Sequence, residues 1–153
     1  MKRFVLILIT MLCSQAYAQN GMHISPLFEG KIVPMNQMVE TRVRGKAISK
    51  YKLSYFHSVR FKADDALVTR IDRLTADDFV ADSEKFKNRE PASEGKRKYS
   101  KDGKISFTQM YELATHGNTN RFLCYKVCDG VMTVIYLEGS VSSLNELKKI
   151  FND

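Results

Sequence analysis

The sequence predicts an α+β fold: an antiparallel sheet of four to five strands, with one long helix and a short C-terminal helix packed mainly on one face. Three observations predict it. Two apolar, strand-like runs flank Asp129-Gly130, a helical pattern covers residues 64–81, and a helix-start signal lies at residues 143–146. Strands joined by short turns, with the helices set apart along the chain, are typical of α+β domains.

The apolar run of residues 121–139 is expected to form the central β-hairpin. Asp-Gly between apolar runs is a strong signal for a type I′ turn, whose two central residues both need a positive φ. The turn sets a register that pairs Cys128 with Val131, Cys124 with Ile135 and Phe122 with Leu137. Because side chains alternate between faces, the opposite face carries Leu123, Tyr125, Val127, Met132, Val134 and Tyr136. We expect this second face to meet the main helices.

Residues 1–18 are expected to be a cleavable signal peptide, and residues 19–153 a single α+β domain. The apolar stretch in this leader is shorter than the ~20 residues of a membrane span, and no second such stretch follows. We therefore expect no transmembrane segment in the mature chain. The signal consists of a basic start at Lys2 and Arg3, an apolar run over residues 4–12 and an A-x-A cleavage site ending at Ala18.

Cleavage after Ala18 predicts a mature N-terminus at Gln19 and a periplasmic or extracellular location. A lipoprotein signal at Cys13 is the alternative, and it is disfavoured because Leu12 precedes that cysteine, where a small residue is usual. Loss of Lys2 and Arg3 lowers the formal net charge from +7 to +5.

The remaining elements follow from shorter patterns. Residues 20–39 are expected to hold a short helical turn at most, with Leu27 and Phe28 as a hydrophobic latch on the sheet edge. Further expectations are a strand at 40–44, a helical turn at 48–53, a strand at 54–61, a polar loop over 82–104 with an edge strand near 97–100, a strand at 105–113 and a turn at 114–119.

The two helices carry recognisable start signals. Asp64 or Asp65 is expected to cap the long helix by accepting a backbone N–H hydrogen bond, and residues 75–78 also fit a kink or restart. Ser143 and Glu146 form a capping box at the start of the closing helix, whose apolar face includes Leu147.

Cys124 and Cys128 are the thiols that remain after export. On an extended strand they lie ~13 Å apart, whereas a disulfide needs Cα atoms within ~7 Å. No intramolecular bridge is therefore expected, and both are interpreted as small core hydrophobes. The alternatives are a reactive thiol, an intermolecular disulfide, or a metal pair with His116.

The histidines and paired carboxylates favour structural roles. His57 lies on the apolar row of a predicted strand, which is more typical of a hydrogen-bonded, semi-buried imidazole than of a catalyst; His116 lies in a turn and His23 near the new N-terminus. Adjacent carboxylates on a helix point in different directions, so Asp64-Asp65 and Asp77-Asp78 are interpreted as helix caps. No calcium loop, phosphate loop, HExxH or GxSxG is present. We assign no catalytic, cofactor-binding or metal-binding residue.

Basic residues form two clusters, one over residues 42–62, where no acidic residue occurs, and one over residues 96–104. Tyr51, Tyr55 and Phe56 are interleaved with the first cluster. Export argues against nucleic acid, so the specific hypothesis is an anionic surface. The commoner explanation is a solvated sheet surface.

Several segments together resemble a family of small exported Bacteroidales proteins of unknown function. The resemblance covers most of the mature chain. The residues that carry it are Phe28-Glu29-Gly30, Glu40 ahead of Gly45-Lys46, the strand at Tyr55–Ser58, the segment Ile135–Gly139 leading into Leu147, and the hairpin aromatics Phe122 and Tyr125. The resemblance implies export and a compact α+β domain, and it implies no activity.

Two function hypotheses of different class follow. The first is a non-enzymatic envelope module that binds a protein or an anionic surface. The second is a small thiol-dependent enzyme that uses His57 or His116 with Cys124 or Cys128, which requires a histidine and a cysteine within hydrogen-bond reach in a pocket. A carrier of a small apolar ligand is a further alternative. The partner and the oligomeric state do not follow from the sequence.

Overall fold

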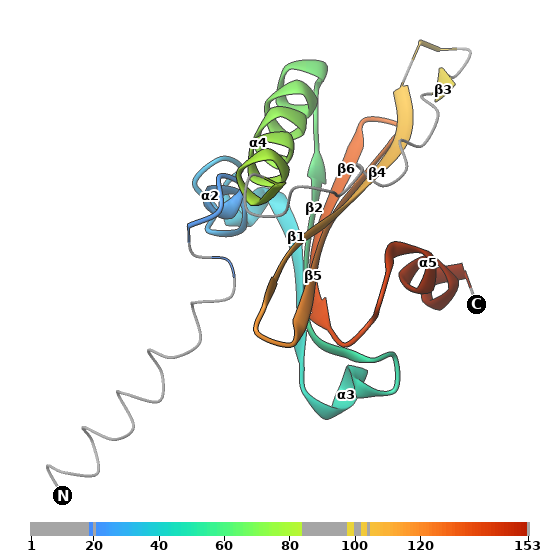
Figure 1. Cartoon of the computed structure of the whole chain (residues 1–153). Coiled ribbons are helices and arrows are strands. Elements are labelled where there is room, and N and C mark those ends of the chain that lie inside the picture. The colour runs from blue at the N-terminus through green and yellow to red at the C-terminus, as the bar shows by residue number, and fades with distance from the viewer. Residues whose placement is uncertain (1–18, 20, 84–97, 100–101, 104, 153) are drawn as a thin grey trace, which may run out of the picture.

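The computed structural model describes residues 19, 21–83, 98–99, 102–103 and 105–152. The expected signal peptide and most of the expected polar loop at 82–104 lie outside the described residues. The described chain forms an antiparallel sheet with helices on both sides (Figure 1). The predicted α+β class is therefore confirmed.

The sheet is six-stranded, in the order β1-β2-β6-β5-β4-β3, and every neighbouring pair is antiparallel. β2 precedes the long helix in sequence but lies beside β6, so the β5–β6 hairpin occupies the centre of the sheet. The short β3 forms the edge strand expected near 97–100. The strands are β1 Met38–Arg44, β2 Leu53–Lys62, β3 Lys98–Tyr99, β4 Ile105–His116, β5 Thr119–Cys128 and β6 Val131–Gly139.

The central hairpin has the predicted turn and register. Asp129 and Gly130 have φ values of 52° and 75°, as a type I′ turn requires. The strands pair Cys128 with Val131, Cys124 with Ile135 and Phe122 with Leu137.

The inner face of the sheet packs against α4 (Asp65–Ser83) and the N-terminal segment, which holds α2 (Ser25–Phe28) and η1 (Met35–Gln37). Leu27 and Phe28 are buried, so the expected latch is part of the main core rather than a cover for the sheet edge. The inner-face ribbon residues meet these elements as predicted. The buried cluster includes Ile24, Val59, Ile71, Leu113, Leu123, Tyr125, Met132, Val134 and Tyr136.

The outer face carries α5 (Leu144–Asn152), on the side opposite α4 (Figure 1). Leu144 and Leu147 pack on Phe122 and Leu137, which point away from α4. The long helix α4 covers one face, together with α2, but the C-terminal helix α5, which was expected mainly on the same face, covers part of the other. α3 (Lys46–Ser49) lies in the β1–β2 connection. None of the described helices is long and apolar enough to cross a membrane.

Several elements differ from the prediction. The helical turn expected at 48–53 is α3, which covers Lys46–Ser49 instead, and Leu53 already belongs to β2. α4 runs without a break through residues 75–78, where Thr75 is fully buried and its hydroxyl donates to the Asp72 carbonyl within the helix. β4 extends to His116, so the turn shortens to residues 117–118. The extra strand residues are held by the buried Ala114, whose N–H donates to the Asp82 carboxylate, and by pairing of His116 with Thr119.

Both helix starts are capped by the expected residues. Asp64 accepts the Leu67 N–H at 2.8 Å, and the Ser143 hydroxyl accepts the Glu146 N–H at 3.2 Å. The Glu146 carboxylate, however, accepts from the N–H and hydroxyl of Ser142 rather than from Ser143. A hydrogen bond from Lys52, with those from Ser142, lowers the pKa of Glu146 to about 2.

Candidate functional site

His57 lies at the centre of a buried polar cluster on the inner face. Its side chain is 1% exposed and packs against the ring of Phe28. Its Nδ1 lies 3.0 Å from Gln19 Nε2 and 3.3 Å from the Tyr55 hydroxyl, and its Nε2 lies 2.7 Å from Glu40 Oε1. The predicted hydrogen-bonded imidazole is therefore confirmed.

The partners of His57 determine its protonation. Because a carboxylate oxygen only accepts, the bond to Glu40 places the proton of neutral His57 on Nε2, and Nδ1 accepts from Gln19. Burial lowers the pKa of His57 and outweighs the opposing bond to Glu40. Burial alone would raise the pKa of Glu40, but hydrogen bonds from His57 and Arg42 lower it overall. The cluster is a neutral imidazole beside an ionised Glu40–Arg42 pair.

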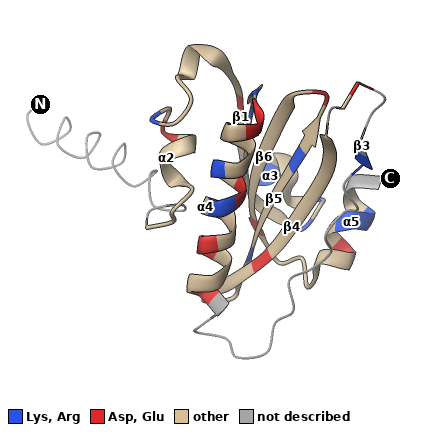
Figure 2. Cartoon of the chain, turned by 90° about the horizontal axis from the view of Figure 1, so that it is seen from above, with Lys and Arg blue, Asp and Glu red and all other residues tan. Residues whose placement is uncertain are grey.

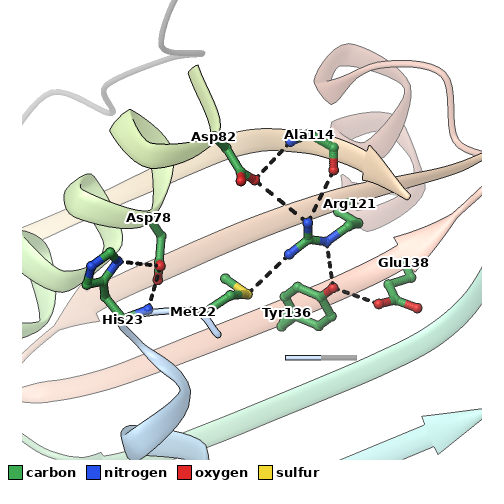
Figure 3. A network of polar contacts seen from close by, with 8 residues as sticks. All are labelled: Met22, His23, Asp78, Asp82, Ala114, Arg121, Tyr136 and Glu138. Atoms are coloured by element: carbon green, nitrogen blue, oxygen red, sulfur yellow. Dashed lines mark hydrogen bonds and ion pairs between the residues drawn. The ribbon is translucent and has the colours of Figure 1, made fainter. Parts of the chain in front are cut away.

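A second polar network joins the N-terminal segment to α4 and the sheet (Figure 3). The Arg121 guanidinium donates from Nε to the Tyr136 hydroxyl at 2.9 Å and contacts Met22 Sδ at 3.4 Å. The same guanidinium lies 3.7 Å from Asp82, and the Tyr136 hydroxyl donates to Glu138 at 2.6 Å. Burial is the main cause that raises the pKa of Tyr136, so its hydroxyl stays protonated.

Asp78 holds the start of the N-terminal segment from the same side (Figure 3). Its carboxylate accepts the backbone N–H of His23 at 2.5 Å and that of Ile24 at 2.9 Å, and His23 Nδ1 lies 3.0 Å away. The predicted capping role within its own helix is wrong for Asp78, because α4 does not restart there. The side chain instead satisfies free amides ahead of α2.

The structure keeps the candidate cysteines and histidines apart. Cys124 is buried on the outer face and Cys128 is exposed there, and both are free thiols. His57 points to the inner face. His116 pairs with Thr119, five residues along β5 from Cys124, which is about 16 Å on a strand. The geometry therefore brings no candidate His–Cys pair together.

The two thiols differ in environment. Burial raises the pKa of Cys124 to about 12, so this thiol is protonated at neutral pH. Its interpretation as a small core hydrophobe is confirmed, whereas Cys128 is exposed and the same interpretation is wrong for it. Cys128 follows the strand alternation onto a face that α5 leaves open, and its Sγ lies 3.6 Å from Asp129 Oδ2.

The outer face offers the accessible candidate site. A basic row crosses its strands, defined here by Arg60 on β2, Thr133 on β6 and Lys126 on β5, which pair directly across the strands. Paired residues point to one face, so both cations project from the side that carries α5. Figure 2 shows basic segments on the sheet and on α5, and both signs of charge on α4.

Two hollows of this face adjoin the basic row. One has a volume of about 390 Å³ and is lined by the row itself with Cys128, Asp129 and Val131. The other has a volume of about 320 Å³ and a mainly apolar lining, which includes Met110, Cys124, Ile135, Leu137, Lys126 and Lys148. The second hollow, with its apolar lining and few polar groups, has the character of a small ligand site.

A family of unknown function, DUF6108, matches residues 11–151. The chain belongs to this family. A search among curated proteins finds no match. The predicted membership of a family without known activity is therefore confirmed, and the DUF6108 match covers nearly the whole chain.

This DUF6108 chain shows no metal-binding group of three or more His, Cys, Asp or Glu residues within the part that the structure describes. Every buried side-chain nitrogen and oxygen in that part has a hydrogen-bond partner. The buried groups of the two inner-face networks are thus all hydrogen-bonded. The outer face differs in that both cations of its basic row are exposed.

Sequence reasoning missed most partners in these networks. Arg121, Gln19 and Asp82 gave no signal, because each meets its partner only through the tertiary fold. Arg60 belongs to the basic cluster at residues 42–62, whereas Lys126 lies in the hairpin, and no local pattern combines them. The hairpin register set by the Asp129-Gly130 turn pairs Lys126 with Thr133, so the sequence predicts these two members of the basic row but not Arg60.

Proposed function

We propose that this protein is a non-enzymatic, exported envelope module that binds an anionic surface through its outer face. Export rests on the signal pattern of residues 1–18, and a Bacteroidales origin on the resemblance described above. The single observation that carries the binding proposal is the basic row on β2, β6 and β5.

The basic row has the properties of a binding surface rather than of a structural ion pair. Arg60 and Lys126 are exposed and lie two strands apart, roughly 10 Å. Neither forms an ion pair with any residue in the described ranges. Thr133 adds a hydroxyl between them. Two unpaired cations on one open face attract anions.

Neighbouring positions extend this positive face. Lys62 pairs with Val131 one row closer to the hairpin turn, and Lys98 pairs with Ser106 on β4. Both lysines are exposed and share the outer face by the alternation of their strands. Asp129, at the turn, is the acidic residue that lines the hollow at the row. The balance of charge there favours an anionic partner.

Vesicle binding tests this proposal. The mature protein is expected to co-sediment with phosphatidylglycerol vesicles and not with phosphatidylcholine vesicles, and to be released by salt. Arg60→Glu with Lys126→Glu is expected to weaken binding at least about tenfold, since each basic residue near an anionic membrane contributes ~1 kcal/mol.

The matched control is Arg70→Glu with Arg73→Glu on α4. It changes the net charge of the protein by the same amount, but at exposed positions on the opposite side of the sheet from the basic row. Equal loss of vesicle binding in both double variants would show that net charge alone is responsible and would refute a role for the outer face. Mass spectrometry of protein secreted by the native host tests export separately, with an N-terminus at Gln19 expected.

A protein partner is the second candidate, favoured by the edge strand β1. Within the described chain β1 pairs only with β2, and Val39 on it is 68% exposed. An open edge accepts an extended segment of another protein by strand addition. A partner captured from envelope extract by the wild type but not by Val39→Lys would support this candidate.

A further inference from the structure

From the outer face we infer a specific ligand: a single-chain anionic phospholipid, with its phosphate at the basic row and its acyl chain in the apolar hollow beside α5. This inference rests on the proposed function and narrows it from a surface to one molecule. Its basis is that the two hollows described above adjoin at a shared residue, Lys126.

The apolar end of the site is built by β4, β5, β6 and α5. Met110 pairs with Cys124, and Cys124 with Ile135, so these side chains form one row across the floor. Leu137, one row further from the hairpin turn, continues the floor toward α5. The hollow lies at the small end of the range of about 300–1,000 Å³ for ligand sites. A single acyl chain fits such a hollow better than the two chains of a bilayer lipid.

The polar end lies one row closer to the hairpin turn. Arg60 and Lys126 flank Thr133 there, and their hollow opens on the same face. A guanidinium donates two parallel hydrogen bonds to phosphate oxygens, and an ammonium adds a point charge. Asp129 also lines this hollow, but Arg60 and Lys126 outnumber it, so the charge of the lining favours an anionic head.

The order of these rows matches the order of groups in an amphiphile. Along β5 the outer-face side chains change from Phe122 under α5, to Cys124 in the apolar hollow, to Lys126 in the basic row. Alternate residues are ~6.6 Å apart on a strand. The acyl chain of the lipid can therefore lie in the apolar hollow while its phosphate lies at the basic row. A second cation, Lys148 of α5, lines the apolar hollow as well.

A third hollow, on the β1–β2 side of the outer face, provides the contrast. It has a volume of about 360 Å³ and is lined by Val43, Ile48, Tyr51, Leu53, Phe56 and Ile150. Its size resembles that of the proposed site, but no cation lines it. Because its lining residues include no cation, this hollow serves as the internal control.

Native mass spectrometry and calorimetry with lauroyl lysophosphatidylglycerol, below its micelle concentration, test the inference. One lipid per protein is expected. Glycerol phosphate alone and lauroyl lysophosphatidylcholine are expected to bind at least about tenfold more weakly, a difference of ~1.4 kcal/mol. Equal binding of glycerol phosphate would overturn the chain site, and equal binding of the choline lipid would overturn the requirement for an anion.

Three variants locate the acyl chain. Met110→Trp, at a half-buried position, fills the proposed hollow and is expected to weaken lysolipid binding at least about tenfold. Thr108→Trp at the same rim replaces it if circular dichroism shows misfolding. Ile48→Trp fills the third hollow and is expected to leave binding unchanged. Loss with Ile48→Trp but not with the other two would place the lipid elsewhere and refute the assignment.

The outcomes separate the two proposals. If lysolipid binding fails but vesicle binding through Arg60 and Lys126 persists, the chain site is refuted and the anionic-surface function stands. Both proposals are supported if the Arg60→Glu with Lys126→Glu variant loses lysolipid binding and vesicle binding, and if Met110→Trp loses lysolipid binding but keeps vesicle binding. If the wild type binds neither lysolipid nor vesicles, both are refuted.

Discussion

His57 combines the partner of a typical catalytic histidine with a position in the core. It is a histidine with a carboxylate partner, the combination found in many active sites, yet it is fully buried among Gln19, Tyr55 and Phe28. Its Nε2–H donates to Glu40, and its Nδ1 accepts from Gln19. Both ring nitrogens are used to join β2 to β1 and to the N-terminal segment.

The buried imidazole predicts a pH-dependent stability. Because burial lowers the pKa of His57 below its ordinary value of 6.5, the unfolded chain binds the proton more tightly than the folded protein. Stability is therefore complete above pH 6.5 and falls as the pH drops through 6.5 toward the folded-state pKa. Thermal unfolding between pH 7.5 and 5.5 should show this decrease.

His57→Gln should flatten that pH profile while lowering stability at pH 7.5 by about 1–3 kcal/mol, the cost of disrupting a buried hydrogen-bonded group. His116→Gln, at the exposed end of β4, is the control and should keep the wild-type slope. A wild-type slope in His57→Gln would assign the titration to another group.

Among the elements, the end of β6 is defined by its contact with the β1–β2 connection. Gly139 pairs with both Leu53 and Asn120, and the backbone of Lys52 runs directly over it. A Cβ on Gly139 would lie 2.2 Å from the Lys52 carbonyl oxygen. Glycine here permits a close approach of two backbone segments.

Gly139→Ala is therefore expected to destabilise the protein by about 1–3 kcal/mol, the usual cost of overpacking. The neighbouring Ser140→Ala should be close to neutral, because Ser140 is exposed. Denaturant unfolding of the two variants measures the difference. Equal stability of both would mean that the β1–β2 connection moves away without cost.

α5 illustrates how a short element decides what remains open. Its Leu144 and Leu147 pack in one cluster with Phe122 and Leu137. Ile135 and Met110 are half-buried at the edge of that cluster, and the two cations of the basic row are exposed. A longer helix with the same apolar face would cover the site proposed for the acyl chain.

In the whole molecule, the segment that follows the expected cleavage site is a part of the core. Gln19 contacts His57, Met22 contacts Arg121, and the backbone N–H groups of His23 and Ile24 both donate to Asp78. Figures 1 and 3 show this segment beside α4 and the inner face. A carboxylate on the long helix holds the backbone of the N-terminal segment.

Asp78→Ala tests that attachment. It leaves two amide N–H groups without their acceptor and should cost about 1–3 kcal/mol, with faster proteolysis near residues 19–24. The adjacent Asp77→Ala, at an exposed position, should be within about 0.5 kcal/mol of the wild type. Equal protease resistance of the two variants would contradict the role assigned to Asp78.

The predictions that succeeded rest on local chemistry. Asp129-Gly130 requires a turn with positive φ, and once that turn is placed, alternation assigns every side chain of the hairpin to a face. Asp64 and Ser143 cap their helices because the cap and its amide lie three residues apart. Such relations act over a few residues, so the chain itself specifies them.

The site depended on contacts between distant segments. Arg60 comes within two strands of Lys126 only because β2 inserts beside β6, and no local pattern encodes that neighbour. Asp78 meets His23 across 55 residues, and Gln19 meets His57 across 38. By itself, the sequence determined the hairpin, its faces and the helix starts, because local backbone geometry specifies them. The tertiary structure alone decided which cations stay exposed together, because strand order and helix coverage arise from the packing of the whole core.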